Sequence, residues 1–382
     1  MMAFLDYEVL RIIWWVLLGV LLIGFAIMDG FDFGVASLLP FVAKTDMEKR
    51  IVINTVGPVW EGNQVWLILG AGAIFAAWPA IYAVSFSGLY LAMFVVLSAL
   101  IIRPVGFKFR SKLENKTWRS VWDFCLFITG VVPGLLFGVA VGNVMQGLPF
   151  HFDETLRITY TGTFFELLNP FALICGVISL TMFMRHGAIY LSIKTEGAIA
   201  KRLSRNINIL TLLQLGGLIM AWWYIYHQVP GYMISSTIDP LGPSNPLNKT
   251  VVHELGHYAM NFRQYSWMLI APAMAFGGIM LSQLLFWINR PGISFIFSAL
   301  SVAGTVSIVG LSMFPFILPS ISHPGHSLTL WDASSSRMTL LIMLTAALIF
   351  VPIILMYTSW VYHVLRGKVS ATSIEKHSGE MY

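Results

Sequence analysis

Residues 9–28 read VLRIIWWVLLGVLLIGFAIM, a stretch in which Arg11 is the single charged residue. A helix needs about 20 mainly apolar residues to cross the hydrocarbon core of a bilayer, so this stretch predicts a first transmembrane span. It lies close to the N-terminus but lacks the short basic segment and the small-residue cleavage site of a signal peptide. We therefore expect it to remain in the membrane.

The composition of the whole chain agrees with a membrane protein. Of its 382 residues 57% are hydrophobic and only 11% are charged, whereas a soluble domain carries about 25% charged residues. The net charge of +5 does not indicate nucleic-acid binding, because the basic residues lie between apolar runs. The two cysteines, Cys125 and Cys175, lie inside such runs, which excludes a disulfide framework and a cysteine-based metal site.

Further apolar runs have the length of membrane spans. The weakest covers 52–77, because polar residues and a proline interrupt its first half. The sequence thus predicts an all-α polytopic membrane protein, a single membrane domain over 1–382 with nine transmembrane helices. After the first, near 9–28, the predicted spans lie near 52–77, 83–102, 122–144, 168–190, 207–226, 266–288, 293–317 and 338–364.

The distribution of lysine and arginine orients these spans. Nine spans place alternate loops on opposite sides, and most of the 23 basic residues then fall on one side: Lys44 to Arg50, Arg103 to Arg119, Arg185 to Arg205, Arg290 and the C-terminal tail. The other side holds Arg11, Arg157, Lys249, Arg263 and Arg337. Basic loops stay in the cytoplasm, so we expect the C-terminus inside and the N-terminus outside. The longest loop, 227–265, is then an outer-face loop, and its prolines suggest an ordered cap with irregular turns.

Acidic residues are concentrated near the cytoplasmic ends of the first three spans. Asp29 and Asp32 follow the first span, and Arg103 closes the third. Glu61 falls roughly 13 Å into the second span at the helical rise per residue. Ionisable groups at membrane depth are costly and are by default hypotheses of function.

Two interpretations of these residues remain open from their chemistry. Carboxylates spaced through an apolar layer are typical of proton relays, since a buried Glu takes and gives a proton near neutral pH. Alternatively, Asp29 and Asp32 cap the span in headgroup water and Glu61 forms a static pair with Arg103. Arg103 itself either holds a carboxylate in its charged form or binds a lipid phosphate.

The same residues belong to motifs that recur in a known family. The motifs are Met28 to Gly34 (MDGFDFG), Trp60 to Trp66 (WEGNQVW), Phe75 to Pro79 (FAAWP), Arg103 to Phe107 (RPVGF), Met313 to Phe316 (MFPF) and Leu330 to Ala333 (LWDA). In this order and spacing the chain resembles subunit II of cytochrome bd ubiquinol oxidase, from Asp6 to Tyr382. One departure is that the family often has Asp where Glu61 stands, which shortens the side chain by one methylene.

The resemblance implies a respiratory oxidoreductase in the bacterial inner membrane, with the N-terminus in the periplasm. Subunit II pairs with a subunit I that carries haem b and haem d, often together with a very small accessory subunit. The complex oxidises quinol and reduces O2 to water without pumping, and takes its protons from the cytoplasm. Each subunit has two four-helix bundles plus one peripheral helix.

The resemblance also assigns roles to residues of this chain. Asp32 and Glu61 match positions of a cytoplasmic proton path, with Asp29 adjacent and Arg103 nearby. Trp66 matches a tryptophan beside an apolar oxygen path, and the family places a structural quinone in subunit II. No residue of this chain is expected to be catalytic or to bind a metal.

The histidines bear on whether the chain holds haem. A haem of the b or d type needs axial His or Met ligands. All nine histidines fall in loops or at the ends of predicted spans: His151, His186, His227, His253, His257, His323, His326, His363 and His377. We therefore expect no haem in this chain.

Two other functions fit single features. Residues 253–257 read HELGH, which on a helix would place two histidines ready for zinc with Glu254 as the base of a peptidase. However, Gly256 weakens such a helix and no third ligand follows at a short spacing, so we expect a solvated cap helix. Pro58 and Gly62 would suit the broken helix of a secondary transporter, but matched interruptions in a second half are missing.

Overall fold

The longest helix of the computed structural model, which describes residues 5–376, is α1 (Tyr7–Val42). Its 36 residues extend about 54 Å at the usual helical rise, well beyond a hydrocarbon core of about 30 Å. The helix therefore continues past residue 28, where the first predicted span ends. Asp29 and Asp32 consequently lie inside the helix and do not cap its end.

Glycines bring α1 close to α7 (Pro170–Lys194), because they allow the two backbones to touch. A Cβ atom on Gly34 would overlap the backbone carbonyl of Phe183, and one on Gly30 would overlap the ring of the same residue. From the other helix, Gly187 lies against the backbone of Phe31 and Gly34. This contact fixes how α1 is rotated, and therefore which of its side chains face inwards.

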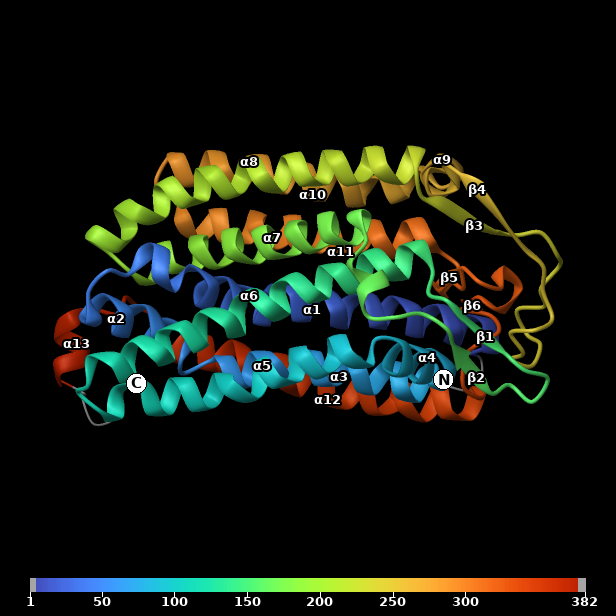
Figure 1. Ribbon diagram of the computed structural model, residues 1–382, viewed down its shortest axis with the longest axis horizontal. Helices are drawn as coiled ribbons and strands as arrows, with labels where there is room; N and C mark the ends of the chain where they lie inside the picture. The colour runs from blue at the N-terminus through green and yellow to red at the C-terminus, as the bar shows by residue number, and fades with distance from the viewer. Residues whose placement is uncertain (1–4, 377–382) are drawn as a thin grey trace.

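The remaining helices pack around α1 in an elongated bundle (Figure 1). They are α2 (Asp46–Val56), α3 (Trp60–Ala77), α4 (Pro79–Gly88), α5 (Tyr90–Phe109), α6 (Lys116–Gln146), α8 (Ala198–His227), α9 (Met260–Gln264), α10 (Ile270–Trp287), α11 (Pro291–Met313), α12 (Arg337–Val364) and α13 (Ala371–Lys376). Short 3-10 turns join them at Arg110–Lys112, Phe165–Leu168, His257–Ala259, Ser266–Leu269 and Pro324–His326.

Three short antiparallel hairpins close one end of the bundle, which we call the strand end (Figure 1). They pair β1 (Phe150–Phe152) with β2 (Ile158–Tyr160), β3 (Pro230–Ile234) with β4 (Val251–Leu255), and β5 (Phe316–Leu318) with β6 (Leu328–Thr329). Arg11 of α1 is fully buried there and donates to the carbonyls of Pro240 and Gly242. A buried ion pair between Lys249 and Asp332 (2.7 Å) holds the same loops together. The outer-face loop is thus ordered.

The opposite end, which we call the α2 end, carries α2 and α13 (Figure 1). Thr45 and Glu48 form a capping box at the start of α2, which satisfies two of the free N–H groups there. An ion pair between Arg202 and Glu48 (2.8 Å) ties α2 to α8 and lowers the pKa of the Glu48 carboxyl. Ile374 of α13 is fully buried against this end.

The expected helical membrane fold is confirmed in outline. Eight of the described helices are long and apolar enough to cross a membrane. The predicted span 52–77 is instead two helices, α2 and α3, separated at Gly57-Pro58-Val59. Trp78 ends α3 because it precedes Pro79, a position that disfavours helical backbone.

Two further predicted spans end elsewhere. The predicted span 83–102 straddles α4 and α5, and the apolar membrane-length helix of that region begins only at Tyr90. The predicted span 293–317 stops early, because α11 ends at Met313 before Pro315 and β5 follows.

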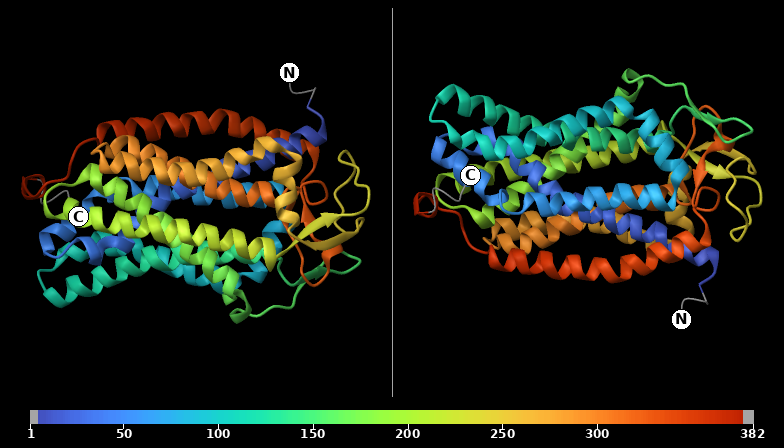
Figure 2. Two further views of the ribbon diagram at one scale, coloured as in Figure 1. Left: turned by 90° about the horizontal axis from the view of Figure 1, so that it is seen from above. Right: turned by 90° about the horizontal axis from the view of Figure 1, so that it is seen from below.

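Helix α12 lies at the margin of the bundle, as both views in Figure 2 show. It contacts α1 and α3, and only 11% of its most apolar window is buried. Leu340 and Leu344, near its strand end, are its two buried residues among those described. The rest of the helix presents apolar side chains outwards, which is the expected surface for lipid or another protein chain.

Replacing Gly34 with Ala should disrupt the contact between α1 and α7. The added methyl group overlaps the backbone of Phe183, which cannot yield without moving α7, so we expect a loss of about 2 kcal/mol or more in stability. Thermal unfolding of the purified protein measures this loss. Gly19→Ala on the same helix is the control, since a Cβ atom there meets nothing within 4 Å. Equal unfolding temperatures for the two variants would contradict the prediction.

Candidate functional site

Two helices bring three charged side chains together inside the bundle. Arg103 of α5 donates to Asp29 Oδ1 at 2.8 Å, and its second terminal nitrogen lies 4.0 Å from Asp32 Oδ2. All three side chains are fully buried. The predicted proximity of these residues is therefore present in the structure, and Arg103 is paired with carboxylates. One guanidinium balances one carboxylate, so the second carboxylate carries either a net negative charge or a proton.

Two neutral residues extend this group towards the edge of the bundle. Asn63 of α3 is 1% exposed and donates from Nδ2 to Asp32 Oδ2 at 2.8 Å. The hydroxyl of Tyr362, on α12, donates to Asn63 Oδ1 at 2.7 Å. We call Asp29, Asp32, Asn63 and Arg103 the acidic cluster. In the sequence Asn63 appears only within the WEGNQVW motif, and no motif indicates Tyr362.

Several polar atoms of the acidic cluster have no partner among the described residues. They are Asp29 Oδ2, Asp32 Oδ1, and the Nε and second terminal nitrogen of Arg103, with Trp60 Nε1 close by. Buried polar groups are nearly always paired with protein or with ordered water. The aromatic rings of Phe33 and Trp60 face the guanidinium at 4.7 and 5.7 Å and stabilise its charge, but they do not satisfy its donors. The cluster therefore has the polarity that internal water requires.

Glu61 does not lie in the acidic cluster, which corrects the expectation of a buried carboxylate and also the alternative of a static pair with Arg103. It stands in the first turn of α3 and is exposed on the surface of the chain. The break before α3 and the helical period explain this, since Trp60, Asn63 and Trp66 face inwards and Glu61 faces the other way. Glu61 heads an exposed apolar stripe of the same helix, formed by Val65, Ile68 and Phe75.

Trp66 lies on the inward face of α3 and is 7% exposed. Its ring fills the space over Gly24 of α1, where a Cβ atom would overlap it. The surrounding cluster is apolar and includes Phe25, Val96 and Leu100. Trp66 therefore packs among apolar side chains, and its role beside an oxygen path stays a prediction.

A second polar centre lies in α7 and contains Arg185 and His186, which were expected in a loop or at a span end. Arg185 is buried and donates to Thr211 Oγ1 (2.9 Å) and to the carbonyl of Ile279 (3.0 Å), without a carboxylate partner among the described residues. His186 is fully buried and pairs with Ser298 at 2.9 Å. The sequence placed Arg185 and His186 at a span end or in a loop, because the predicted span stops at residue 190. Helix α7 continues to Lys194, so both residues lie inside the helix.

The HELGH motif forms no helix, which corrects both the zinc interpretation and the predicted cap helix. Its first residues pair in β4, and Gly256 has a left-handed backbone with φ of +75°. His253 then faces the ring of Tyr232, whereas His257 lies beyond the turn, 3.9 Å from Glu254. Among residues 5–376 no group of three or more His, Cys, Asp and Glu side chains is arranged to hold a metal ion.

Three other histidines meet at the strand end. The ring centroids of His151 and His323 are 4.8 Å apart, and those of His323 and His326 are 5.2 Å apart. Nδ1 of His326 accepts a hydrogen bond from the backbone N–H of Phe152 at 3.0 Å. Burial lowers the pKa of His326 from its usual 6.5, and nearby His323, His151 and Lys249 lower it further. His377 lies outside the described residues.

Known proteins resemble this chain over almost its full length. The family model described as cytochrome bd terminal oxidase subunit II matches residues 10–365. A probable cytochrome oxidase subunit 2 of Haemophilus influenzae is 51% identical, and the alignment covers 99% of this chain and all of that protein. The cytochrome bd-I ubiquinol oxidase subunit 2 of Escherichia coli K12 is 46% identical with the same coverage.

The fold also resembles a solved structure. A chain of the bd oxidase from Geobacillus thermodenitrificans superposes with a TM-score of 0.68, covering 93% of this chain and 98% of that one. The two sequences are only 18% identical, so this likeness concerns the fold alone.

The pKa of His326 makes the strand end sensitive to acid. A histidine whose pKa is lower when folded than when unfolded favours the unfolded chain as it gains a proton. Stability is therefore complete above about pH 6.5 and falls as the pH drops below that value. We expect His326→Asn, which keeps an acceptor for Phe152 N–H without titrating, to flatten this dependence. Limited proteolysis of the loops between about pH 5 and 8 measures it. An unchanged dependence would contradict the prediction, and His227→Asn, at an exposed residue, is the control.

Proposed function

The chain belongs to the cytochrome bd terminal oxidase subunit II family, and from this membership we propose that it is the haem-free subunit of a quinol:oxygen oxidoreductase. The complex oxidises quinol, reduces O2 to water and translocates protons without pumping. This chain supports a haem-bearing subunit I and conducts protons to it from the cytoplasm. The observation that carries the proposal is the buried acidic cluster, which holds one carboxylate more than its arginine balances.

The proposed topology has nine transmembrane helices, formed as two four-helix bundles plus the peripheral α12, in the bacterial inner membrane. Helix α1 begins at the strand end and α13 lies at the other (Figure 1), which supports an odd number of crossings. Helix α3 supplies the ninth beside the eight apolar helices. Basic residues such as Lys49, Arg110 and Arg202 gather at the α2 end, which supports a cytoplasmic α2 end and a periplasmic strand end.

The packing of His186 supports the proposal that haem b and haem d belong to subunit I. His186 is the one histidine inside the bundle among the described residues. Its ring stacks on Phe295 with centroids 4.5 Å apart and lies edge-on to Phe31 at 6.3 Å. Ser298 takes one ring nitrogen. Nε2 has no hydrogen-bond partner among the described residues, but aromatic side chains of the chain itself pack against the ring, and this packing does not fit a haem.

In the proposed proton path, Asp29 and Asp32 share one proton, because Arg103 neutralises only one of the two carboxylates. Glu61 transfers this proton across the boundary between the two subunits. A carboxylate exposed to lipid at membrane depth is costly. The exposed stripe headed by Glu61 therefore suits a partner chain better than lipid. We propose that this face of α3 contacts subunit I, and that Glu61 becomes buried there.

The remaining partners follow from the family resemblance. We propose that oxygen passes through the apolar cluster around Trp66. The complex also takes a very small accessory subunit, membrane lipids and a structural quinone. No residue in this chain is assigned a catalytic role of its own.

Purification of the membrane complex through a tag on this chain tests the proposed function directly. We expect a haem-rich partner to co-purify and the optical spectrum to contain b- and d-type haem bands. The isolated chain, expressed without its partner, should lack these bands. A complex without haem, or haem retained by the isolated chain, would refute the corresponding part of the proposal.

Replacing Glu61 with Gln should lower quinol oxidase turnover about tenfold or more, as removal of a proton-transferring group does. Assembly and haem content should remain near normal, because Gln keeps the size of the side chain at the proposed contact and Glu61 is exposed, without an ion pair among the described residues. Turnover per haem measures the effect. Glu61→Asp should retain activity, and Glu196→Gln, at an exposed carboxylate paired with Lys368, is the control. Normal turnover in Glu61→Gln would remove Glu61 from the path.

A further inference from the structure

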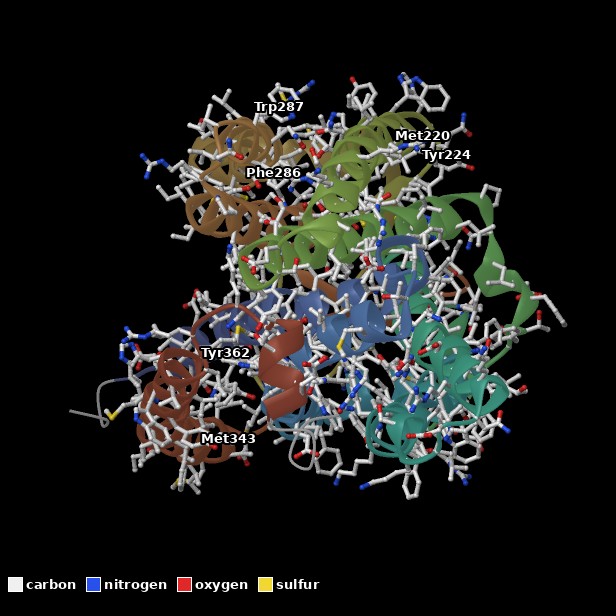
Figure 3. All side chains as sticks on the ribbon, turned by 90° about the vertical axis from the view of Figure 1, so that its left-hand side faces the viewer. Met220, Tyr224, Phe286, Trp287, Met343 and Tyr362 are labelled. Atoms are coloured by element: carbon white, nitrogen blue, oxygen red, sulfur yellow. The ribbon has the colours of Figure 1, made fainter. Side chains whose placement is uncertain are left out.

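Tyr362 connects the peripheral helix to the buried acidic cluster. It lies two residues before the end of α12 at Val364, close to the α2 end of the bundle. Seen from that end, Tyr362 is on the side of α12 turned towards the neighbouring helices (Figure 3). Its ring is partly buried against the core. Near the α2 end, Val361 and Tyr362 are the residues of α12 that pack against the core among the described residues.

The hydrogen bonds from Tyr362 to Asp32 have a defined direction. The phenol O–H donates to Asn63 Oδ1 (2.7 Å), and Asn63 Nδ2 donates to Asp32 Oδ2 (2.8 Å). An amide has its acceptor on one side and its donors on the other. A donor at Oδ1 therefore forces the N–H group of Asn63 to point at Asp32, where it stabilises the carboxylate form.

We propose that Tyr362 is a positioning residue for proton uptake, which acts through Asn63 to hold Asp32 as a hydrogen-bond acceptor. The inference rests on the proposed function, because it assumes that Asp32 exchanges protons during turnover. Without the phenol, the Asn63 amide is free to turn its oxygen towards Asp32. In that orientation only a protonated Asp32 completes the hydrogen bond, so Asp32 retains its proton at a higher pH.

Other groups around Asp32 do not replace this control. The charged and titratable side chains that face it are Asp29 on the same helix, Arg103 from α5, Tyr190 from α7 and Tyr362. Arg103 lies at 4.0 Å from Asp32 and donates directly to Asp29. The hydroxyl of Tyr190 donates to the carbonyl of Thr55. The described structure thus gives Asp32 a single hydrogen-bond donor, Asn63.

The test compares Tyr362→Phe with Tyr357→Phe in the assembled complex. Both variants lose one phenol from α12, but Tyr357 is 62% exposed and faces away from the cluster. Turnover is recorded per haem across a range of pH, so that only the assembled complex contributes. Asp32→Asn should remove the part of the pH profile that reflects proton binding by Asp32. In Tyr362→Phe we expect this part of the profile to lie about one pH unit higher than in the wild type. This is the shift that loss of one hydrogen bond to a charged group implies. Tyr357→Phe should match the wild type.

The outcomes separate this inference from the proposed function. If Asp32→Asn turns over like the wild type, the proton path through Asp32 is wrong, whatever Tyr362 does. If Asp32→Asn lowers turnover but Tyr362→Phe has the wild-type profile, only the role of Tyr362 is overturned. Failure of Tyr362→Phe to assemble, with Tyr357→Phe normal, would assign the hydroxyl to structure alone and also overturn it. A shift in Tyr362→Phe that is absent from the Asp32→Asn/Tyr362→Phe double variant supports the proposal.

Discussion

The pairing of Arg103 with Asp29 and Asp32 is the interaction on which this half of the bundle depends. Three charges are removed completely from solvent, and burial of an ion is costly unless close partners offset the lost hydration. The glycine contact between α1 and α7 makes the arrangement possible, because it turns both aspartates towards α5. Helices α3 and α12 then complete the hydrogen bonds through Asn63 and Tyr362.

The two halves of the bundle use buried charge differently. Around α1 and α5 a cation is matched by carboxylates, and polar atoms without a protein partner remain. Around α7 and α8 a lone guanidinium, Arg185, is held by a hydroxyl and a backbone carbonyl. Among the described residues, only the first arrangement contains carboxylates beside its arginine. The asymmetry supports the proposal that protons are taken up through the half around α1 and α5.

The sequence alone predicted most spans and the grouping of Asp29, Asp32 and Arg103, since long apolar runs and rare charges are strong signals in a membrane protein. It could not place Glu61, because α3 is apolar on both faces and no amphipathic pattern indicates its rotation. It also missed Tyr362, whose partner Asn63 is 299 residues away along the chain. The HELGH motif misled for a similar reason, since β-pairing with β3 overrode the helical interpretation.

Helix α12 lies at the margin of the bundle (Figure 2) and is little buried, so the bilayer borders the helix that contacts the acidic cluster. A helix longer than the hydrocarbon thickness is accommodated by tilting or kinking. The 28-residue α12 contacts mainly α1 and α3, which leaves it few protein contacts to oppose such a change. Acyl-chain length and lateral pressure thus bear on the same helix end that carries Tyr362. A detergent micelle imposes neither of them in the same way. A change in the tilt of α12 would therefore reach Asp32 through the hydrogen bonds of Tyr362 and Asn63.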